Sequence, residues 1–281
     1  MTRVYPGVTP VHALGPLDLD LTRGEFFSVV GPSGCGKSTL LDVLAGLSPP
    51  TAGKISFEDR PVVHEVPDGI GVVFQEDASF PWLAVRDNVA FGLRRAGTDP
   101  AEIARRVAYA IRFMGLDDFA DAFPAQLSGG MRQRVCIART LVLQPRLILL
   151  DEPFGALDQQ TRLLMGDELL RLWRETGSTI LLITHALDEA ALLSDRVGVM
   201  SARPGRFIDL VKSHNITPRL VRLGWFCVAV KGVAAAATAS FASFTEVPST
   251  IARTGFIASI VRPPLVIKPP GSYEQLPCEV L

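Results

Sequence analysis

The residues with the clearest chemical meaning form one unbroken run, Gly31-Pro32-Ser33-Gly34-Cys35-Gly36-Lys37-Ser38-Thr39. The run fits the pattern G-x-x-x-x-G-K-[ST] of a phosphate-binding loop. Its glycines let the backbone curl so that N–H groups point at phosphate oxygens, and a helix that begins there adds partial positive charge. Lys37 would reach the β- and γ-phosphates, and the Ser38 hydroxyl would bind Mg²⁺. The run predicts a nucleotide-phosphate site; a glycine turn that happens to end in Lys-Ser is the alternative.

The segments on both sides of this run are those that a phosphate-binding loop needs. The apolar residues of 26–30 predict a buried strand before it. After it, Leu40, Leu41 and Leu44 recur at helical spacing, and Gly46 is suited to end the helix. A strand, a glycine loop and a helix in this order direct the N–H groups of the loop toward a ligand.

Three more apolar runs predict strands that end in polar residues. The strands are 70–74, 146–150 and 179–184, and the polar residues at their ends are Gln75, Asp151 and His185. Ligands of open α/β sheets bind outside the carboxyl ends of the strands, so we expect these side chains to share one site with the phosphate loop. Each also has a simpler interpretation: a loop residue for Gln75, a capped or core histidine for His185, and a helix start for Asp151.

The expected chemistry of this group is hydrolysis. Asp151 would hold Mg²⁺, and the adjacent Glu152 would orient or deprotonate the water that attacks the γ-phosphate. A neutral His185 would hydrogen-bond a γ-phosphate oxygen and the water, and Gln75 would contact both the metal ion and the water. Together with a phosphate loop, these residues predict a nucleotide hydrolase.

The remaining patterns predict how the chain is organised around this site. Residues 17–21 alternate apolar and polar side chains, which predicts a half-exposed strand. From about 76 to 135 the sequence changes to Arg- and Ala-rich helical patterns, with 101–114 the clearest helix. Continuous apolar strands alternating with helices indicate a parallel sheet covered on both faces. The predicted fold is therefore α/β, with a helical insert and an antiparallel β part near the N-terminus.

Composition excludes several classes of function. The chain has 281 residues and a net charge of −1, so no basic field attracts it to nucleic acid or to acidic lipid. Its four cysteines include no C-x-x-C pair, which argues against a zinc site or a disulfide framework. No signal peptide is expected at the start, and the best candidate for a membrane span, 223–244, is interrupted by Lys231. We expect a cytosolic protein that reaches a membrane only through a partner.

The segment Leu127-Ser128-Gly129-Gly130-Met131-Arg132-Gln133-Arg134 resembles the signature motif of ABC-type ATPases. Asp151-Glu152-Pro153-Phe154-Gly155-Ala156-Leu157-Asp158 looks like the Walker B and D-loop run of the same family. The resemblance covers about residues 1–212 and implies a P-loop NTPase core that binds ATP with Mg²⁺. It identifies the helical insert, about 76–135, as the helical subdomain of a nucleotide-binding domain.

The same resemblance implies that the site is completed by a second copy of the chain. In this family each ATP lies between the phosphate loop of one subunit and the Ser-Gly-Gly of the other, here Ser128, Gly129 and Gly130. Backbone N–H groups at a helix start and a serine hydroxyl are suited to a γ-phosphate. Asp158 would communicate across the dimer. Met131 stands where glutamine is usual, which should weaken a polar contact to the nucleotide. A plain glycine turn is the alternative interpretation of this motif.

Residues 75–83, followed by 87–93, look like those of ATPases that serve nitrate, sulfonate and taurine importers. In that group this surface receives the coupling helices of a membrane permease, and the apolar Phe80-Pro81-Trp82 would be the docking patch. Local packing of the helical insert explains the same residues. Tyr5 lies about where the family places an aromatic residue that stacks on adenine, although a lone tyrosine near a terminus is often incidental.

Both ends of the chain depart from the family. Relatives usually have a strand before the position of Tyr5, so either that strand is short here or the true start lies upstream. The resemblance stops near Lys212, and 213–281 has few acids and no clear period. We expect a divergent, loosely ordered tail; a small regulatory or anchoring segment is the alternative.

The resemblance implies an ATPase subunit that energises an ABC importer for nitrate, sulfonate, taurine or a related small solute. Its partners would be permease subunits, a second copy of itself and, indirectly, a periplasmic solute-binding protein, with no nucleic acid. It would be peripheral, on the cytoplasmic side of the inner membrane. The alternatives are a soluble ABC ATPase without a permease and a remnant that binds nucleotide but does not assemble.

Overall fold

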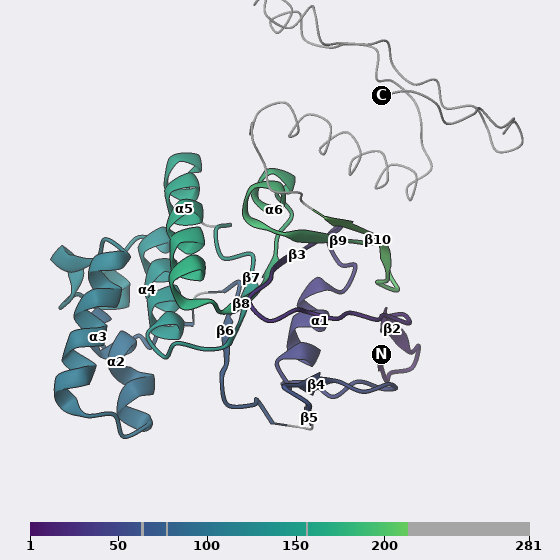
Figure 1. Cartoon of the computed structure of the whole chain (residues 1–281), viewed down its shortest axis with the longest axis horizontal. Coiled ribbons are helices and arrows are strands. Elements are labelled where there is room, and N and C mark those ends of the chain that lie inside the picture. Colours follow the sequence, from purple (N-terminus) through teal and green to yellow (C-terminus); the bar gives the residue numbers. More distant parts are fainter. Residues whose placement is uncertain (63–64, 77, 156, 213–281) are drawn as a thin grey trace, which may run out of the picture. The chain divides into compact units, whose positions relative to one another are not determined.

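A computed structural model describes residues 1–62, 65–76, 78–155 and 157–212 (Figure 1). The predicted tail, 213–281, lies outside the described residues. The strands are β1 (Arg3–Tyr5), β2 (Val11–Leu14), β3 (Phe26–Val30), β4 (Ser56–Phe57), β5 (Arg60–Pro61), β6 (Ile70–Val73), β7 (Leu147–Asp151), β8 (Thr179–Ile183), β9 (Arg196–Met200) and β10 (Phe207–Lys212). The helices are α1 (Lys37–Leu44), α2 (Val85–Arg95), α3 (Pro100–Phe113), α4 (Gly129–Leu141), α5 (Gln159–Thr176) and α6 (Leu187–Leu193), with short 3₁₀ turns at Asp117–Phe119 and Pro124–Gln126.

The main sheet has six strands in the order β10-β9-β3-β8-β7-β6. All neighbours pair in parallel except β10, which runs antiparallel to β9 at one edge. The strands that precede Gly31, Gln75, Asp151 and His185 in the sequence analysis are β3, β6, β7 and β8, which are consecutive in the sheet. The predicted mainly parallel α/β sheet is therefore confirmed, and these strands end at one common edge.

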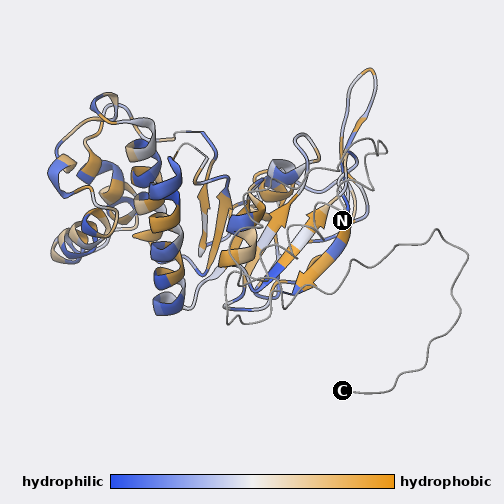
Figure 2. Cartoon of the chain, turned by 90° about the horizontal axis from the view of Figure 1, so that it is seen from above, coloured by the Kyte–Doolittle hydropathy of each residue, from blue (hydrophilic) through white to orange (hydrophobic). Residues whose placement is uncertain are grey.

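Both faces of the sheet are buried, because successive side chains of a strand point to opposite faces. On one face Ile148 and Leu150 of β7 belong to a core that includes residues of α4 and α5. On the other face Leu147 and Leu149 pack with α1 and with residues of the N-terminal segment. In Figure 2 the strands of the main sheet are mostly coloured as hydrophobic, whereas the helices carry both colours. Continuous apolar runs thus correspond to doubly covered strands, as predicted.

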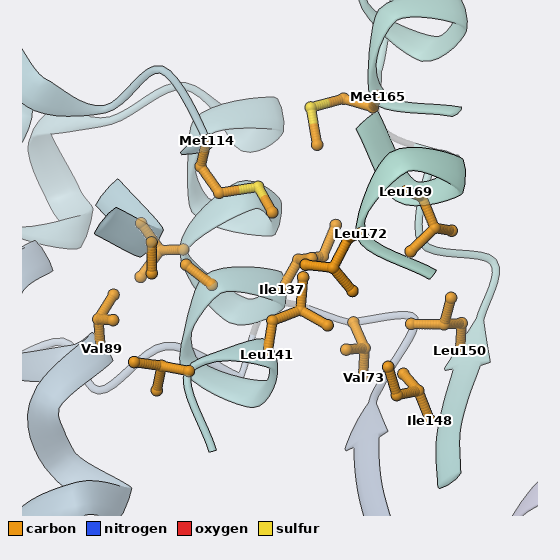
Figure 3. Close-up of a cluster of buried hydrophobic side chains, with 14 of the residues drawn as sticks. Val73, Val89, Met114, Ile137, Leu141, Ile148, Leu150, Met165, Leu169 and Leu172 are labelled. Carbon is orange, nitrogen blue, oxygen red and sulfur yellow. The ribbon is translucent and has the colours of Figure 1, made fainter. Parts of the chain in front are cut away.

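Helix α4 joins the helical part of the chain to the sheet. Ile137 and Leu141 of α4 lie between Val89 of α2 and Ile148 of β7 (Figure 3).

Helix α3 begins at a well-formed N-cap, where the Asp99 side chain accepts hydrogen bonds from the next turn. None of the helices in the described ranges combines the length and the apolar character that crossing a membrane requires.

The N-terminal part contains two small antiparallel ribbons, β1–β2 and β4–β5. The prediction of a strand at 17–21 was wrong in one respect. Leu17 is buried and Asp18 is exposed, as the alternation requires, but the segment joins no sheet in the described part of the chain. Leu17 exchanges backbone hydrogen bonds with Met1, and the Asp20 carbonyl is bonded instead by the Arg196 side chain. Alternating apolar and polar residues determine which side of a segment faces the core, whereas a β-strand also needs a neighbouring strand with which it can form backbone hydrogen bonds.

Candidate nucleotide-binding and hydrolysis site

The phosphate loop connects β3 to α1, as the sequence predicts. Gly34 and Gly36 adopt φ angles of 72° and 109°, in the region that favours glycine. A Cβ atom at Gly36 would lie 2.8 Å from the carbonyl oxygen of Ala13, so a larger residue would also collide with the chain behind the loop. Gly36 is the N-cap of α1, and its conformation directs the start of the helix toward the interior of the loop.

The Lys37 side chain folds back into the loop that precedes it. Its ammonium nitrogen donates to the carbonyl oxygens of Gly31 at 2.9 Å and Pro32 at 3.2 Å. The residue is buried, so these carbonyls replace the water that the charge has lost. The amine is therefore held inside the loop, where a phosphate anion would be its natural counter-ion.

Asp151 is the residue that fits a metal ion best. It closes β7, is only 6% exposed, and its Oδ1 has no hydrogen-bond partner among the described residues. Burial raises the pKa of this carboxyl, the nearby Glu152 acts in the same direction, and the Ser38 hydroxyl and Lys37 oppose the shift. A buried carboxylate oxygen beside a serine hydroxyl is suited to Mg²⁺, which prefers one or two protein ligands together with phosphate oxygens and water.

Glu152 lies directly opposite the histidine that was predicted to share its site. Glu152 Oε2 is 3.1 Å from His185 Nδ1. The Glu152 backbone has a φ of 45°, a conformation that residues other than glycine rarely adopt. The backbone N–H of Glu152 donates to the Ile183 carbonyl at 2.9 Å. Such strain is found where the surrounding structure holds a side chain in a required direction. Here the hydrogen bond to β8 fixes Glu152 next to His185.

The sheet register explains why residues far apart in sequence meet here. Asp151 pairs with Ile183, Val29 of β3 pairs with the same residue, and Val73 of β6 pairs with Leu150. Asp151, His185 and the phosphate loop therefore lie on three neighbouring strands. Gln75 follows β6 at the outer side of this group and is exposed to solvent.

The residues of the signature motif form the start of α4. The Ser128 hydroxyl oxygen accepts a hydrogen bond from the Met131 N–H at 3.2 Å, which makes Ser128 the N-cap. Ser128 and Gly129 are exposed, and the first turn contains no acid. Among the described residues no hydrogen bond joins this turn to the phosphate loop of the same chain. The partly buried side chain of Met131, in the first turn of α4, packs against the hydrophobic core.

Asp158 and Tyr5 also have local partners. The Asp158 carboxylate caps α5 and accepts hydrogen bonds from the Thr161 N–H at 3.0 Å and hydroxyl at 2.6 Å, which lower its pKa. Tyr5 lies in β1, with the Arg3 guanidinium 4.6 Å from the centre of its ring.

Sequence reasoning missed one residue that touches the phosphate loop. Arg203 Nε donates to the Gly34 carbonyl at 3.2 Å from the turn between β9 and β10. The neighbouring Gly205 is buried and exchanges backbone hydrogen bonds with Ala13 and Gly15. The 203–205 turn thus supports the loop from outside. Nothing in the local pattern links Arg203 to a residue so distant in the sequence.

The comparisons with known proteins agree with this geometry. The family profile described as "ABC transporter" matches residues 14–155. An uncharacterized ABC transporter ATP-binding protein of Methanocaldococcus jannaschii is 48% identical over 212 residues, which are 74% of this chain and 78% of that protein. This chain belongs to the ABC transporter family of ATP-binding proteins.

Two further matches place this ABC transporter subunit among its relatives. The taurine import ATP-binding protein TauB of Pelagibacter ubique is 48% identical over 210 residues, covering 73% of this chain and 76% of that protein. A solved dimeric ATP-binding cassette in a post-hydrolysis state, bound to ADP and Pi, has a TM-score of 0.70 at 32% identity and covers 76% of this chain and 97% of that chain. The predicted P-loop NTPase fold of the ABC type is confirmed, and the chain is an ATP-hydrolysing subunit.

Proposed function

We propose that this ABC transporter ATPase drives the import of a small anionic or zwitterionic solute of the taurine, sulfonate or nitrate class. The observation that carries the proposal is its 47–48% identity to taurine import ATP-binding proteins of several organisms. The permease and a periplasmic solute-binding protein would select the solute, and this chain would supply the ATP hydrolysis.

The proposed hydrolysis uses the residues at the carboxyl edge of the sheet. The phosphate loop, 31–39, and Lys37 bind the phosphates. Glu152 accepts the proton of the water whose oxygen forms a bond to the γ-phosphorus, while the bond to the β-phosphate oxygen breaks. His185, held beside Glu152, donates a hydrogen bond to the γ-phosphate or orients the water. Ser38, Asp151 and Gln75 would hold Mg²⁺, which neutralises charge on the β- and γ-phosphate oxygens when it is bound.

We further propose that two copies of the chain close on two ATP molecules. The exposed start of α4, with Ser128, Gly129 and Gly130, carries the donors that a γ-phosphate from another chain would need. The dimeric ADP-bound relative supports this arrangement. Asp158 would form part of the contact between the copies, and Tyr5 would stack on adenine. Loss of the γ-phosphate would remove the bridging anion and open the dimer.

An exposed aromatic surface supports the proposed permease contact. Trp82 is 71% exposed, and the rings of Phe80 and Trp82 lie 5.6 Å apart. The fully buried Asn88 holds this loop: its amide accepts from the Phe80 N–H at 2.7 Å and donates to the Leu83 carbonyl at 2.8 Å. Arg139 of α4 lies over the Phe80 ring at 4.8 Å. A rigid aromatic patch of this kind is typical of protein interfaces.

The proposal also assigns the parts of the chain and their location. Residues 1–212 would form the nucleotide-binding domain, with the helical subdomain at about 76–135, and 213–281 would be a divergent tail. The domain would sit on the cytoplasmic side of the inner membrane, attached through permease subunits. The helical subdomain would carry the aromatic patch, so permease movements would reach the ATP site through α4.

Co-expression with the permease subunits of a taurine-type importer tests the proposal. The expected result is a complex that imports taurine or a related sulfonate into proteoliposomes when ATP is enclosed in the lumen, on the side of the ATPase subunit, and the solute and its binding protein are outside. ATP hydrolysis without any complex formation would instead indicate a soluble ABC ATPase. Nucleotide binding without ATP-dependent dimerisation would indicate a chain that does not assemble.

A further inference from the structure

A partly buried polar network joins the two loops that carry Glu152 and His185. Arg162 of α5 donates from Nη2 to the Leu157 carbonyl at 3.1 Å, and its Nε forms an ion pair with Glu189 Oε1 of α6 at 3.4 Å without making a hydrogen bond to it. Glu189 Oε2 accepts a hydrogen bond from the Thr184 hydroxyl at 2.6 Å. The Thr184 hydroxyl in turn accepts from the Ala186 N–H at 3.0 Å. One carboxylate therefore connects α5, α6 and the end of β8.

The Thr184 end of the network is shielded from water, which makes the contact between Thr184 and Glu189 strong and its loss costly. Thr184 is 2% exposed, the Glu189 side chain is 11% exposed, and the Arg162 side chain is 29% exposed. Burial raises the pKa of Glu189, while the Thr184 hydroxyl and Arg162 oppose that shift. Removing one partner of such a group leaves the others desolvated and unpaired. Arg171 and Glu175, further along α5, form an exposed pair at 3.0 Å and lack these connections.

These contacts close a ring that contains the hydrolytic pair. Thr184 directly precedes His185, and its N–H bonds to the Val29 carbonyl, two residues before the phosphate loop. Leu157, held by Arg162, lies on the loop that begins at Glu152. The ring runs from Glu152 through Phe154, whose carbonyl accepts a hydrogen bond from the Leu157 N–H at 3.1 Å, then through Arg162 and Glu189 to Thr184, and through His185 back to Glu152.

We propose that Arg162 and Glu189 are positioning residues that hold His185 against Glu152 in the hydrolytic state. Neither touches the nucleotide site directly; they act through Thr184 and Leu157. The inference rests on the roles proposed above for Glu152 and His185. A shift of about 1 Å in a catalytic group can cost on the order of 100-fold in rate, so loss of the network should lower turnover while leaving ATP binding intact.

The test uses Glu189→Gln, the isosteric Thr184→Val and the hydroxyl-retaining Thr184→Ser in the full-length chain. Single-turnover ATP hydrolysis gives the rate of chemistry, and a fluorescent ATP analogue gives the nucleotide Kd. We expect Glu189→Gln and Thr184→Val to lower the hydrolysis rate about tenfold or more, within the range that misplacement of a catalytic group produces. The Kd should change less than about twofold, which is small beside that loss. Thr184→Ser keeps the hydroxyl and should keep most of the rate.

Epistasis with His185→Ala separates positioning from a general structural effect. If Glu189 acts through His185, adding Glu189→Gln to His185→Ala should lower the rate by less than about twofold, because residues that act as a unit are not additive. An additive tenfold loss in that background overturns the inference, as does an unchanged rate in both Glu189→Gln and Thr184→Val. The exposed pair supplies the matched control, and Glu175→Gln should retain the wild-type rate.

The same experiment distinguishes three outcomes: a variant that does not fold, an error in the proposed hydrolytic roles, and an error in the positioning inference alone. If Glu189→Gln does not fold, the two Thr184 variants still decide, since Thr184→Val replaces only the hydroxyl group by a methyl group and Thr184→Ser keeps the hydroxyl group. Full turnover in Glu152→Gln and His185→Ala would mean that the proposed hydrolytic roles are wrong. Slow turnover in those variants together with normal turnover in the network variants would reject the positioning inference alone.

Discussion

Asp151→Asn offers a sharp test of the metal site, because two effects of opposite sign are expected from one change. Asp151 Oδ1 is buried without a hydrogen-bond partner in the part of the chain that the structure describes, and burial raises the pKa of the carboxyl. A buried polar group without a partner costs about 1–3 kcal/mol, and more if it is charged. The neutral amide lowers that cost, so the variant should be more stable than the wild type without nucleotide.

The expected change in Tm follows from the free energy that the buried carboxyl costs. A gain of about 1–3 kcal/mol corresponds to a rise in Tm of roughly 2–4 °C for each kcal/mol in a domain of this size. With MgATP the wild type should instead be more stable than Asp151→Asn. Ligand at a hundred times its Kd stabilises the wild type by about 2.7 kcal/mol, and the Mg²⁺-dependent part of this gain should be lost in the variant.

The pH dependence has a definite sign. Because the folded-state pKa of Asp151 is raised above its usual value, the wild type is favoured at low pH and loses stability as the pH rises through that folded-state pKa. The stabilisation by Asp151→Asn should therefore be largest near neutral pH and should shrink below the usual aspartate pKa, where the wild-type acid is neutral in both states.

Thermal unfolding with and without nucleotide, Mg²⁺ and EDTA provides the assay. Asp158→Ala is a useful control, because the Asp158 carboxylate has local partners and its removal should lower the Tm. A nucleotide-free Asp151→Asn protein that is less stable than the wild type would refute the reasoning. An undiminished Mg²⁺-dependent shift in that variant would remove Asp151 from the metal site.

Three further predictions follow from named contacts. Glu152→Gln should bind ATP as well as the wild type does, and its turnover should fall about 10²–10⁴-fold, the usual contribution of a general base; full turnover would exclude this role. Arg203→Met removes the donor to the Gly34 carbonyl and should weaken ATP binding measured by fluorescence titration, with Arg203→Lys intermediate; equal Kd values would show that the contact is not needed. Trp82→Ala should reduce co-purification of the permease at an unchanged Tm, because Trp82 is mostly exposed, whereas a lower Tm would mean that Trp82 serves packing.

The sequence determined those features that depend on local pattern. The glycines and Lys37 of the phosphate loop have to lie between a strand and a helix for their backbone donors to converge, and the run predicts this without tertiary information. The apolar segment before Asp151 predicts β7 because a strand covered on both faces needs apolar side chains at every position. The helix at 100–113 is predicted to within one residue, as 101–114, for a similar reason, since its periodic pattern extends over several turns.

Features that depend on partners distant in the sequence were decided only by the tertiary structure. Residues 17–21 have the alternation of a strand but join no sheet in the described part of the chain, because pairing requires a neighbouring ladder. The strand order brings Glu152 and His185 to 3.1 Å, whereas the sequence indicated only that both follow strands. Arg162 and Glu189 look like ordinary charges on exposed helix faces, but the packing of α5 against α6 partly buries them and pairs them with each other. Burial and long-range contact define the chemistry of such groups, and neither can be read from local sequence spacing.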